Sequence, residues 1–318
     1  MEKISAVIMC FNEEENLPRL IESLKGADEV IIVDHMSTDK TSELAKSLGA
    51  KVFQIANKID TVFQSDREEF IKKYGFFPTF KAGDKIGDGS ADRAYGISKA
   101  KNDWVFCPDA DEIVTWDLPE IKKLLTDHDQ INCNFIHSRK PNGSPECVLE
   151  ICKLFRKSNS RWYGRIHDVV VGTNPRTIKT DKMKMEHFKK PKEYRNGQLG
   201  KMEYALFKDQ SPRMLFYTAR EYFYNAMYEK ALQLYNEYMP KAWWRSEIAE
   251  AWLLMAKCSW QIQKGDDSRK YCLNAIAVNP DFKEALLDMS EYTGDDQKEY
   301  WKRYADIATS NNVLFKRV

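Results

Sequence analysis

Residues 103–112 read DWVFCPDADE, a short apolar run followed by acidic residues. The run from Trp104 to Cys107 is typical of a buried strand, and buried strands rarely end in several acids unless a positive charge lies there. Asp109 and Asp111, separated by one residue, can share a divalent cation, and such a cation can hold a nucleotide diphosphate. The alternative is a solvated acidic turn, which the sequence around this stretch disfavours.

The segments around this stretch alternate between strands and helices. Apolar runs predict strands at residues 5–10, 30–33, 51–55, 131–136 and 148–155. Helical patterns lie between them, at residues 16–24, 37–49 and 92–100. Residues 30–33 are all β-branched, which suits a central parallel strand. Strands joined by short helices predict an α/β domain with a mostly parallel central sheet and right-handed crossovers.

The character of the chain changes near residue 212, beyond which we expect only helices. Helical periodicity runs through residues 217–238 and 248–262, and residues 266–278 follow as a partner helix. Small and large residues in this region fall near the pattern of a tetratricopeptide repeat. We therefore predict two domains. Residues 1–200 form the α/β domain, with an insertion at 57–90, and residues 201–318 form an all-α, tetratricopeptide-like helical domain.

The composition limits the partners of the chain. Its 318 residues are 43% hydrophobic, which suits a globular protein of two domains. Lys+Arg 49 against Asp+Glu 48 gives a net charge of +1, so no overall field attracts nucleic acid, although this does not exclude duplex DNA. The first strand begins too early for a signal peptide, and no apolar run approaches the roughly 20 residues of a membrane span. Seven cysteines without zinc-site spacing fit reduced thiols, so we expect a cytoplasmic protein with no membrane span.

Four polar segments should meet at one edge of the predicted sheet. They are residues 11–14, residues 34–39, the pair Asp92-Arg93 and the acidic stretch that ends in Asp111. Ligands of open α/β sheets bind beyond the carboxyl ends of the strands, so this placement suits a nucleotide. The sequence lacks the glycine-rich motifs of dinucleotide-binding and P-loop proteins, which argues against both classes.

The order and spacing of these segments resemble those of the family-2 glycosyltransferases of GT-A fold. The resemblance rests on VIMCFNEEENL at residues 7–17, VD at 33–34, STD at 37–39, Arg93 and DAD at 109–111. The closer likeness is to members with a tetratricopeptide extension, including those that glycosylate bacteriocin peptides. LFR at residues 154–156 and GRIHD at residues 164–168 carry that likeness.

The resemblance implies which residues hold a nucleotide sugar. Phe11, Asn12 and Glu13 would line the pocket for the base and ribose. Asp34 would reach the base or the ribose, and Arg93 would face the nucleotide or its diphosphate. Asp109 would take part in binding the nucleotide as well as the metal.

The resemblance also implies a metal site and a general base. Asp111, assisted by Asp109, would hold Mg²⁺ or Mn²⁺ against the two phosphates. Asp168 would act as the general base, at a position where the family more often has glutamate, and His167 would bind the metal or contact the diphosphate. The other interpretation of His167 is a buried structural histidine, and we take His187 as structural.

These implications predict a metal-dependent, inverting glycosyltransferase that uses a nucleotide sugar, expected to be a UDP-sugar. The acceptor would be a peptide, a protein or a saccharide, and the helical tail would bind it or form a homodimer. The alternatives are a catalytically inactive scaffold and a nucleotidyltransferase on the same fold. The insertion at residues 57–90 is either a lid anchored by Phe76, Phe77 and Phe80 or a subdomain with its own small core.

Overall fold

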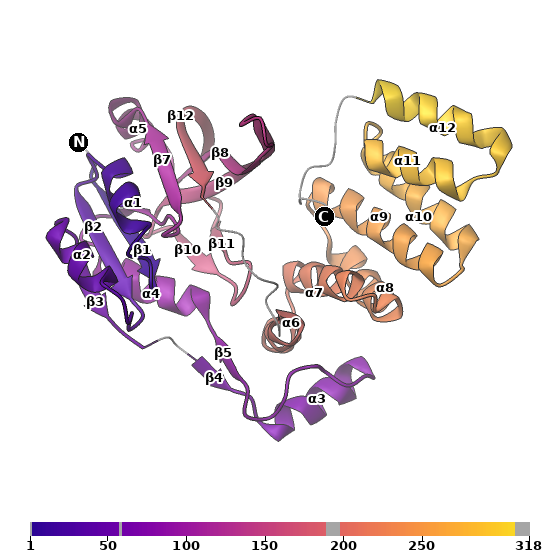
Figure 1. Ribbon diagram of the computed structural model, residues 1–318, viewed down its shortest axis with the longest axis horizontal. Helices are drawn as coiled ribbons and strands as arrows, with labels where there is room; N and C mark the ends of the chain where they lie inside the picture. Colours follow the sequence, from indigo (N-terminus) through magenta and orange to yellow (C-terminus); the bar gives the residue numbers. More distant parts are fainter. Residues whose placement is uncertain (1, 57–58, 189–197, 309–318) are drawn as a thin grey trace. The chain divides into compact units, whose positions relative to one another are not determined.

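A computed structural model of the chain describes residues 2–56, 59–188 and 198–308 (Figure 1). The contacts between residues divide the chain into two compact units. Unit 1 spans Met1–Thr61 and Lys85–Tyr194, and unit 2 spans Val62–Asp84 and Arg195–Val318. Residues 62–84, which interrupt unit 1 in the sequence, therefore make their contacts within unit 2.

Unit 1 is built around one large sheet with the strand order β3-β2-β1-β6-β9-β8-β12-β7. Its strands are β1 (Ile4–Cys10), β2 (Glu29–Asp34), β3 (Lys51–Gln54), β6 (Trp104–Phe106), β7 (Glu112–Trp116), β8 (Gln130–Arg139), β9 (Pro145–Arg156) and β12 (Thr177–His187). β3, β2, β1 and β6 run parallel, as do β8 and β12. β9 is antiparallel to β6 and β8, and β7 is antiparallel to β12. The predicted α/β fold with a mostly parallel sheet is thus confirmed.

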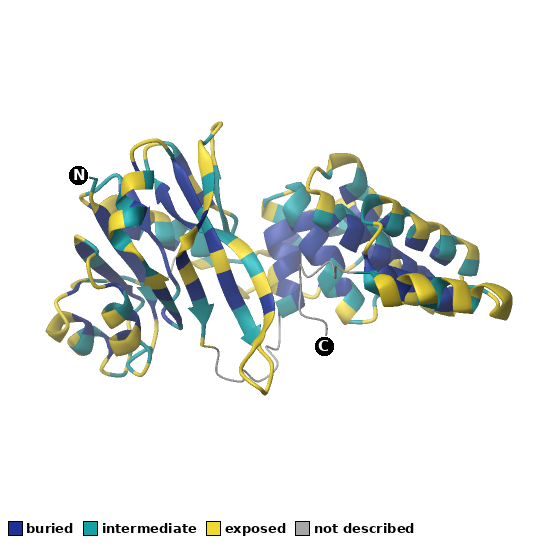
Figure 2. Ribbon diagram, turned by 90° about the horizontal axis from the view of Figure 1, so that it is seen from above, coloured by how far each residue is buried: buried dark blue, intermediate teal, exposed yellow. Residues whose placement is uncertain are grey.

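Helices cover both faces of this sheet. They are α1 (Leu17–Ser23), α2 (Thr41–Ser47), α4 (Gly89–Lys99) and α5 (Leu118–Leu124). Because successive side chains of a strand point to opposite faces, Ala6 and Ile8 of β1 enter one apolar cluster and Val7 enters another. Figure 2 shows long buried runs along these strands. Two small ribbons complete the unit: β4 (Ile59–Thr61) pairs with β5 (Lys85–Gly87), and β10 (Ser160–Tyr163) pairs with β11 (Val169–Gly172).

The regular elements in the described residues of unit 2 are all helices. Its elements are α3 (Gln64–Tyr74), α6 (Gln198–Lys208), α7 (Pro212–Tyr224), α8 (Tyr228–Tyr238), the short 3₁₀ helix η1 (Met239–Lys241), α9 (Arg245–Gln261), α10 (Gly265–Val278), α11 (Lys283–Tyr292) and α12 (Asp295–Ile307). From α6 to α12, each α-helix packs against the next one along the chain (Figure 1). The periodic run at 217–238 is not one helix, because the chain turns between α7 and α8, where Ala226 has a φ of 56°. No helix in the described parts of the chain has the length and apolar character needed to cross a lipid bilayer.

The aromatic cluster of the inserted segment packs on α6 and α7. The ring of Phe76 meets Tyr222 edge-on with centroids 5.7 Å apart, and Phe80 meets Tyr204 in the same way at 5.5 Å. The hydroxyl of Tyr222 donates a hydrogen bond of 2.7 Å to the fully buried carboxylate of Glu203. The segment therefore shares its core with the helices of unit 2 instead of closing a core of its own.

The same carboxylate also fixes the backbone of the inserted segment. The backbone N–H and the hydroxyl of Thr79 donate hydrogen bonds of 2.5 Å and 2.7 Å to Glu203. Phe77, in contrast, is 71% exposed. Of the three rings expected as anchors of a lid, Phe77 alone has a largely exposed side chain.

Helix α4 lies tightly against the sheet at Gly96. A Cβ atom at this position would come within 2.7 Å of Val7 Cγ1 and 2.8 Å of Val33 Cγ2, both on buried strands. We expect Gly96→Ala to lower the free energy of unfolding by about 1–3 kcal/mol, because β-branched side chains cannot easily move aside. Urea denaturation measures this change. The control Gly265→Ala, with no atom nearer than 3.7 Å, should be as stable as the wild type or slightly more so.

Candidate functional site

The predicted polar segments meet where three parallel strands end. β1 ends at Cys10, which is paired with Asp34 at the end of β2. β6 ends at Phe106, and the acidic turn with Asp109 and Asp111 lies between β6 and β7. The sheet thus brings the loops after β1, β2 and β6 to one edge, as expected for a ligand site of an α/β sheet.

Hydrogen bonds join the loop after β1 to the loop after β2. Asn12 has a φ of 54°, and its backbone N–H donates to Ser37 Oγ at 2.9 Å. The side-chain oxygen of Asn12 accepts from the backbone N–H of Thr38 at 2.8 Å. The backbone N–H of Glu13 donates to Thr41 Oγ1 at 2.8 Å. Asn12 and Glu13 are therefore held beside the second loop.

Asp34 lies fully buried beneath these loops. Its Oδ1 accepts hydrogen bonds from the backbone N–H of Ser37 at 3.0 Å and the hydroxyl of Ser37 at 2.5 Å. Its Oδ2 accepts from Gln54 Nε2 at 2.9 Å. A ligand would have to displace one of these partners to reach the carboxylate. Phe11, in contrast, is 54% exposed.

Asp109 lies between two cations. Arg93 Nη2 is 2.5 Å from its Oδ1, and Lys153 Nζ is 2.7 Å from its Oδ2. Burial opposes the charge of Asp109, but Lys153 and Arg93 outweigh it and hold the pKa of this carboxyl well below its usual range. Asp109 is therefore ionised and has a cation on each oxygen, which leaves it poorly suited to bind a metal directly.

Lys153 stands on β9 beside the acidic turn, because its carbonyl accepts a hydrogen bond from the backbone N–H of Cys107. Its side chain is 4% exposed, and its ammonium lies 2.7 Å from both oxygens of Glu112. Burial, reinforced by the charge of Asp109, raises the pKa of Glu112 to about 6 although Lys153 opposes the rise. Sequence reasoning included Glu112 only as one of the acids after the strand, without a role of its own, and it missed Lys153. The available signal was the lone cation within the apolar run ICKLF at residues 151–155.

Arg93 connects the acidic turn to the predicted base. Its Nε donates to Asp168 Oδ2 at 2.7 Å, and its guanidinium lies 4.6 Å from the ring centre of Trp162, which is buried. Burial works against the charge of Arg93, but Asp109 and Asp168 raise its pKa above the usual range. One guanidinium from α4 therefore joins residues that lie far apart in the sequence.

Asp111 has a different partner. Its Oδ2 is 3.0 Å from His187 Nε2, and the side chains are 18% and 14% exposed. The register of β12 against β7 explains this contact, because it pairs His187 with Glu112, the neighbour of Asp111. His187, which we expected to be structural, therefore also contacts the acidic turn. No group of three or more His, Cys, Asp or Glu side chains in the described parts of the chain is placed to hold a metal ion.

His167 and Asp168 lie in the loop between β10 and β11. His167 is exposed and has a φ of 54°, so the interpretation of this residue as a buried histidine is wrong. Asp168 is partly buried and reaches the site through Arg93.

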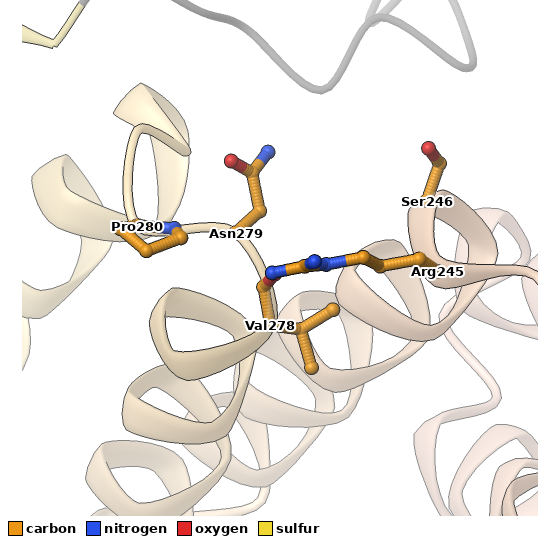
Figure 3. Close-up of a pocket in the computed structure, with 5 residues that line it drawn as sticks. All are labelled: Arg245, Ser246, Val278, Asn279 and Pro280. Carbon is orange, nitrogen blue, oxygen red and sulfur yellow. The ribbon is translucent and has the colours of Figure 1, made fainter.

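Unit 2 has a separate shallow pocket of about 260 Å³ (Figure 3). Arg245 and Ser246 of α9 line one side, and residues 278–280 line the other. Arg245 Nε donates to the carbonyl oxygen of Val278 at 2.7 Å, so the guanidinium is held across the pocket. The pocket contains none of the predicted site residues.

Comparison with known proteins supports the resemblance for part of the chain. Residues 5–61 match the family model described as glycosyl transferase family 2. An uncharacterised glycosyltransferase of Rickettsia typhi is 34% identical over 132 residues, which cover 41% of this chain and 35% of that protein. The 4,4'-diaponeurosporenoate glycosyltransferase of Staphylococcus haemolyticus is 40% identical over 57 residues, which cover 17% of this chain and 15% of that protein. The chain thus spans about a third of the length of the Rickettsia relative and less of the other.

Solved structures give weaker likenesses. Glucosyl-3-phosphoglycerate synthase of Mycobacterium tuberculosis, solved with Mn²⁺, uridine diphosphate and glucosyl-3-phosphoglycerate, is 21% identical with a TM-score of 0.28 over 42% of this chain and 44% of that chain. MamA is 14% identical with a TM-score of 0.30 over 35% of this chain and 63% of that chain. TM-scores this low do not support any conclusion about this chain. The likeness to family-2 glycosyltransferases is confirmed over residues 5–61, and the tetratricopeptide and bacteriocin resemblances stay predictions.

Lys153 should be essential for the stability of unit 1. We expect Lys153→Met to lower the free energy of unfolding by about 3–5 kcal/mol, because Glu112 is left buried without its cation. Replacing both residues, as Lys153→Met with Glu112→Gln, should recover most of this loss. The amide oxygen can still accept the hydrogen bond that Asp109 N–H now donates to Glu112. Urea denaturation tests both variants, and a single variant as stable as the wild type would contradict a buried ion pair.

Proposed function

We propose that the chain is a metal-dependent, inverting glycosyltransferase that moves a sugar from a nucleotide sugar, expected to be a UDP-sugar, to an acceptor. The observation that carries this proposal is the double contact of Arg93. Its guanidinium joins Asp109, the first acid of the Asp-Ala-Asp motif, to Asp168, the predicted base. The glycosyl transferase family 2 match over residues 5–61 and the names of the relatives support the same reaction class.

The donor would bind at the edge where β1, β2 and β6 end. We propose that Phe11, Asn12 and Glu13 line the pocket for the base and ribose, since Phe11 is exposed and the other two are held against the second loop. Asp34 would support this pocket from below, where it binds Ser37. Arg93 would face the diphosphate.

Asp111 and His187 are the pair that we propose for the cation. A carboxylate oxygen and an imidazole nitrogen are ligand types that Mn²⁺ accepts, and Mg²⁺ would rely more on oxygen ligands from phosphate and water. When bound, either ion would stabilise the charge that grows on the departing nucleoside diphosphate. Asp109 would assist through its charge, and His167 stays a second candidate for contact with the metal or the diphosphate.

Asp168 would act as the general base. The acceptor oxygen forms a bond to the anomeric carbon as the bond from that carbon to the phosphate oxygen breaks. The electron pair stays with the nucleoside diphosphate, and the acceptor proton passes to Asp168. Because Arg93 already holds Oδ2, we propose that Oδ1 takes this proton. Attack from the face opposite the leaving group inverts the anomeric centre.

The helical unit is our reason for proposing an acceptor class. Successive helices from α6 to α12 pack as neighbours along the chain, an arrangement that suits a peptide or protein acceptor or a homodimer contact. A saccharide acceptor is the alternative. We place the reaction in the cytoplasm, which agrees with seven cysteines that are all free thiols. The inactive scaffold and the nucleotidyltransferase are the competing functions, and donor binding with metal separates the scaffold from the enzymes.

Donor binding should depend on metal and on Asp111. In a thermal-shift panel of UDP-, GDP-, TDP- and CMP-sugars, we expect a UDP-sugar to raise the Tm only when Mn²⁺ is present. Asp111→Asn should abolish this rise, and His187→Ala should reduce it. The control Asp181→Asn changes a carboxylate that is 86% exposed and should behave as the wild type. If no donor raises the Tm of the wild type, the scaffold is the better proposal.

Asp168 should act on the chemical step and not on donor binding. Asp168→Asn should lower kcat by about 10²- to 10⁴-fold, the usual contribution of a general base, while the donor-induced rise in Tm persists. Release of nucleoside diphosphate from the best donor of the panel, with water as the acceptor, measures kcat before the natural acceptor is known. An unchanged kcat would remove Asp168 from the mechanism.

A further inference from the structure

The loop that carries His167 and Asp168 has an unusual backbone. Gly164 has a φ of 105° and His167 has a φ of 54°. A residue other than glycine has a strained backbone in the left-handed region, and this conformation persists when the surrounding contacts fix it. The contacts that hold this loop therefore determine where Asp168 lies.

Arg165 makes the contacts that hold the part of the loop before His167. Its Nη2 is 2.7 Å from Asp60 Oδ2 and 3.5 Å from Asp88 Oδ2. Its carbonyl oxygen accepts a hydrogen bond of 3.3 Å from the backbone N–H of Gly89. The side chain is 18% exposed, so water only partly screens these charges.

The partners of Arg165 lie on the β4-β5 ribbon and at the start of α4. Asp60 lies on β4, and Asp88 is the N-cap of α4, where it accepts a hydrogen bond from the backbone N–H of Ala91 at 3.1 Å. The first turn of α4 also lies against the loop. A Cβ atom at Gly89 would be 3.4 Å from the carbonyl oxygen of Arg165 and 3.9 Å from Asp168 Oδ2. The loop is thus held before His167 by Arg165 and after it by the ion pair of Arg93 with Asp168.

We propose that Arg165 is a positioning residue that clamps the loop at residues 164–168 onto β4 and α4, and so sets the place of Asp168. The effect of this position on catalysis rests on the proposed function, in which Asp168 is the base. A planar guanidinium can face two carboxylates at once, whereas a lysine ammonium is a single point charge on a flexible stem. Displacing a catalytic group by about 1 Å can cost about 10²-fold in rate.

The test compares Arg165→Met, Arg165→Lys and Asp60→Asn with the wild type. Lys122→Met is the control, because Lys122 forms an ion pair of 3.1 Å with Asp28 at a similar side-chain exposure of 15% and 25%. Hydrogen exchange of peptides that cover residues 164–168 reports the loop. Hydrolysis of the donor chosen from the thermal-shift panel, with Mn²⁺, gives kcat and KM.

Arg165→Met should speed exchange in the loop and lower kcat about 10²-fold, with KM for the donor close to the wild-type value. Arg165→Lys and Asp60→Asn should show smaller changes of the same kind, because each keeps part of the clamp. Lys122→Met should change neither readout.

Wild-type exchange in the loop of Arg165→Met would overturn the proposal, as would exchange that rises equally throughout unit 1 in Asp60→Asn. A faster-exchanging loop with unchanged kcat would also overturn it. If no donor binds any of the proteins, the proposed function fails, and the exchange data alone decide whether Arg165 holds the loop.

Discussion

The pairing of the acidic turn with Arg93 and Lys153 is the interaction on which the site depends. Asp109 and Glu112 follow a buried strand, where uncompensated carboxylates would be costly. Arg93 reaches Asp109 from α4, and Lys153 reaches both acids from β9. The carboxylates of the turn can therefore stay ionised because α4 and β9 each supply a cation. The fold and the charge pattern of the site support each other.

The sequence predicted the parts of the site whose signals are local. The strands that became β1, β2 and β6 are apolar runs, and the acids that follow them had to lie at their carboxyl ends. Lys153, Glu112 and His187 depend on which strands become neighbours and in what register. The pairing of His187 with Glu112, for instance, joins β12 to β7 across a long stretch of sequence. No periodicity within one strand contains that information.

The inserted segment shows the same limit in unit 2. Its aromatic residues indicated a cluster, and a cluster is present. Its partners, however, are Tyr204 and Tyr222, more than a hundred residues further along the chain. Phe80 is buried against Tyr204, and the buried Glu203 carboxylate of α6 accepts hydrogen bonds from Thr79 of the segment. Composition thus predicted the cluster but not the unit to which it belongs.

The excess of carboxylates over cations at the site gives a physical reason for a bound cation in the proposed reaction. Asp109, Asp111, Glu112 and Asp168 are four carboxylates, whereas Arg93 and Lys153 supply two positive charges. A nucleoside diphosphate adds further negative charge, so its approach to this edge would be opposed by the carboxylates that Arg93 and Lys153 do not offset. A divalent ion between Asp111 and the phosphates would remove that opposition. The charges of the described site therefore support the proposed metal dependence, whichever sugar the anionic donor carries.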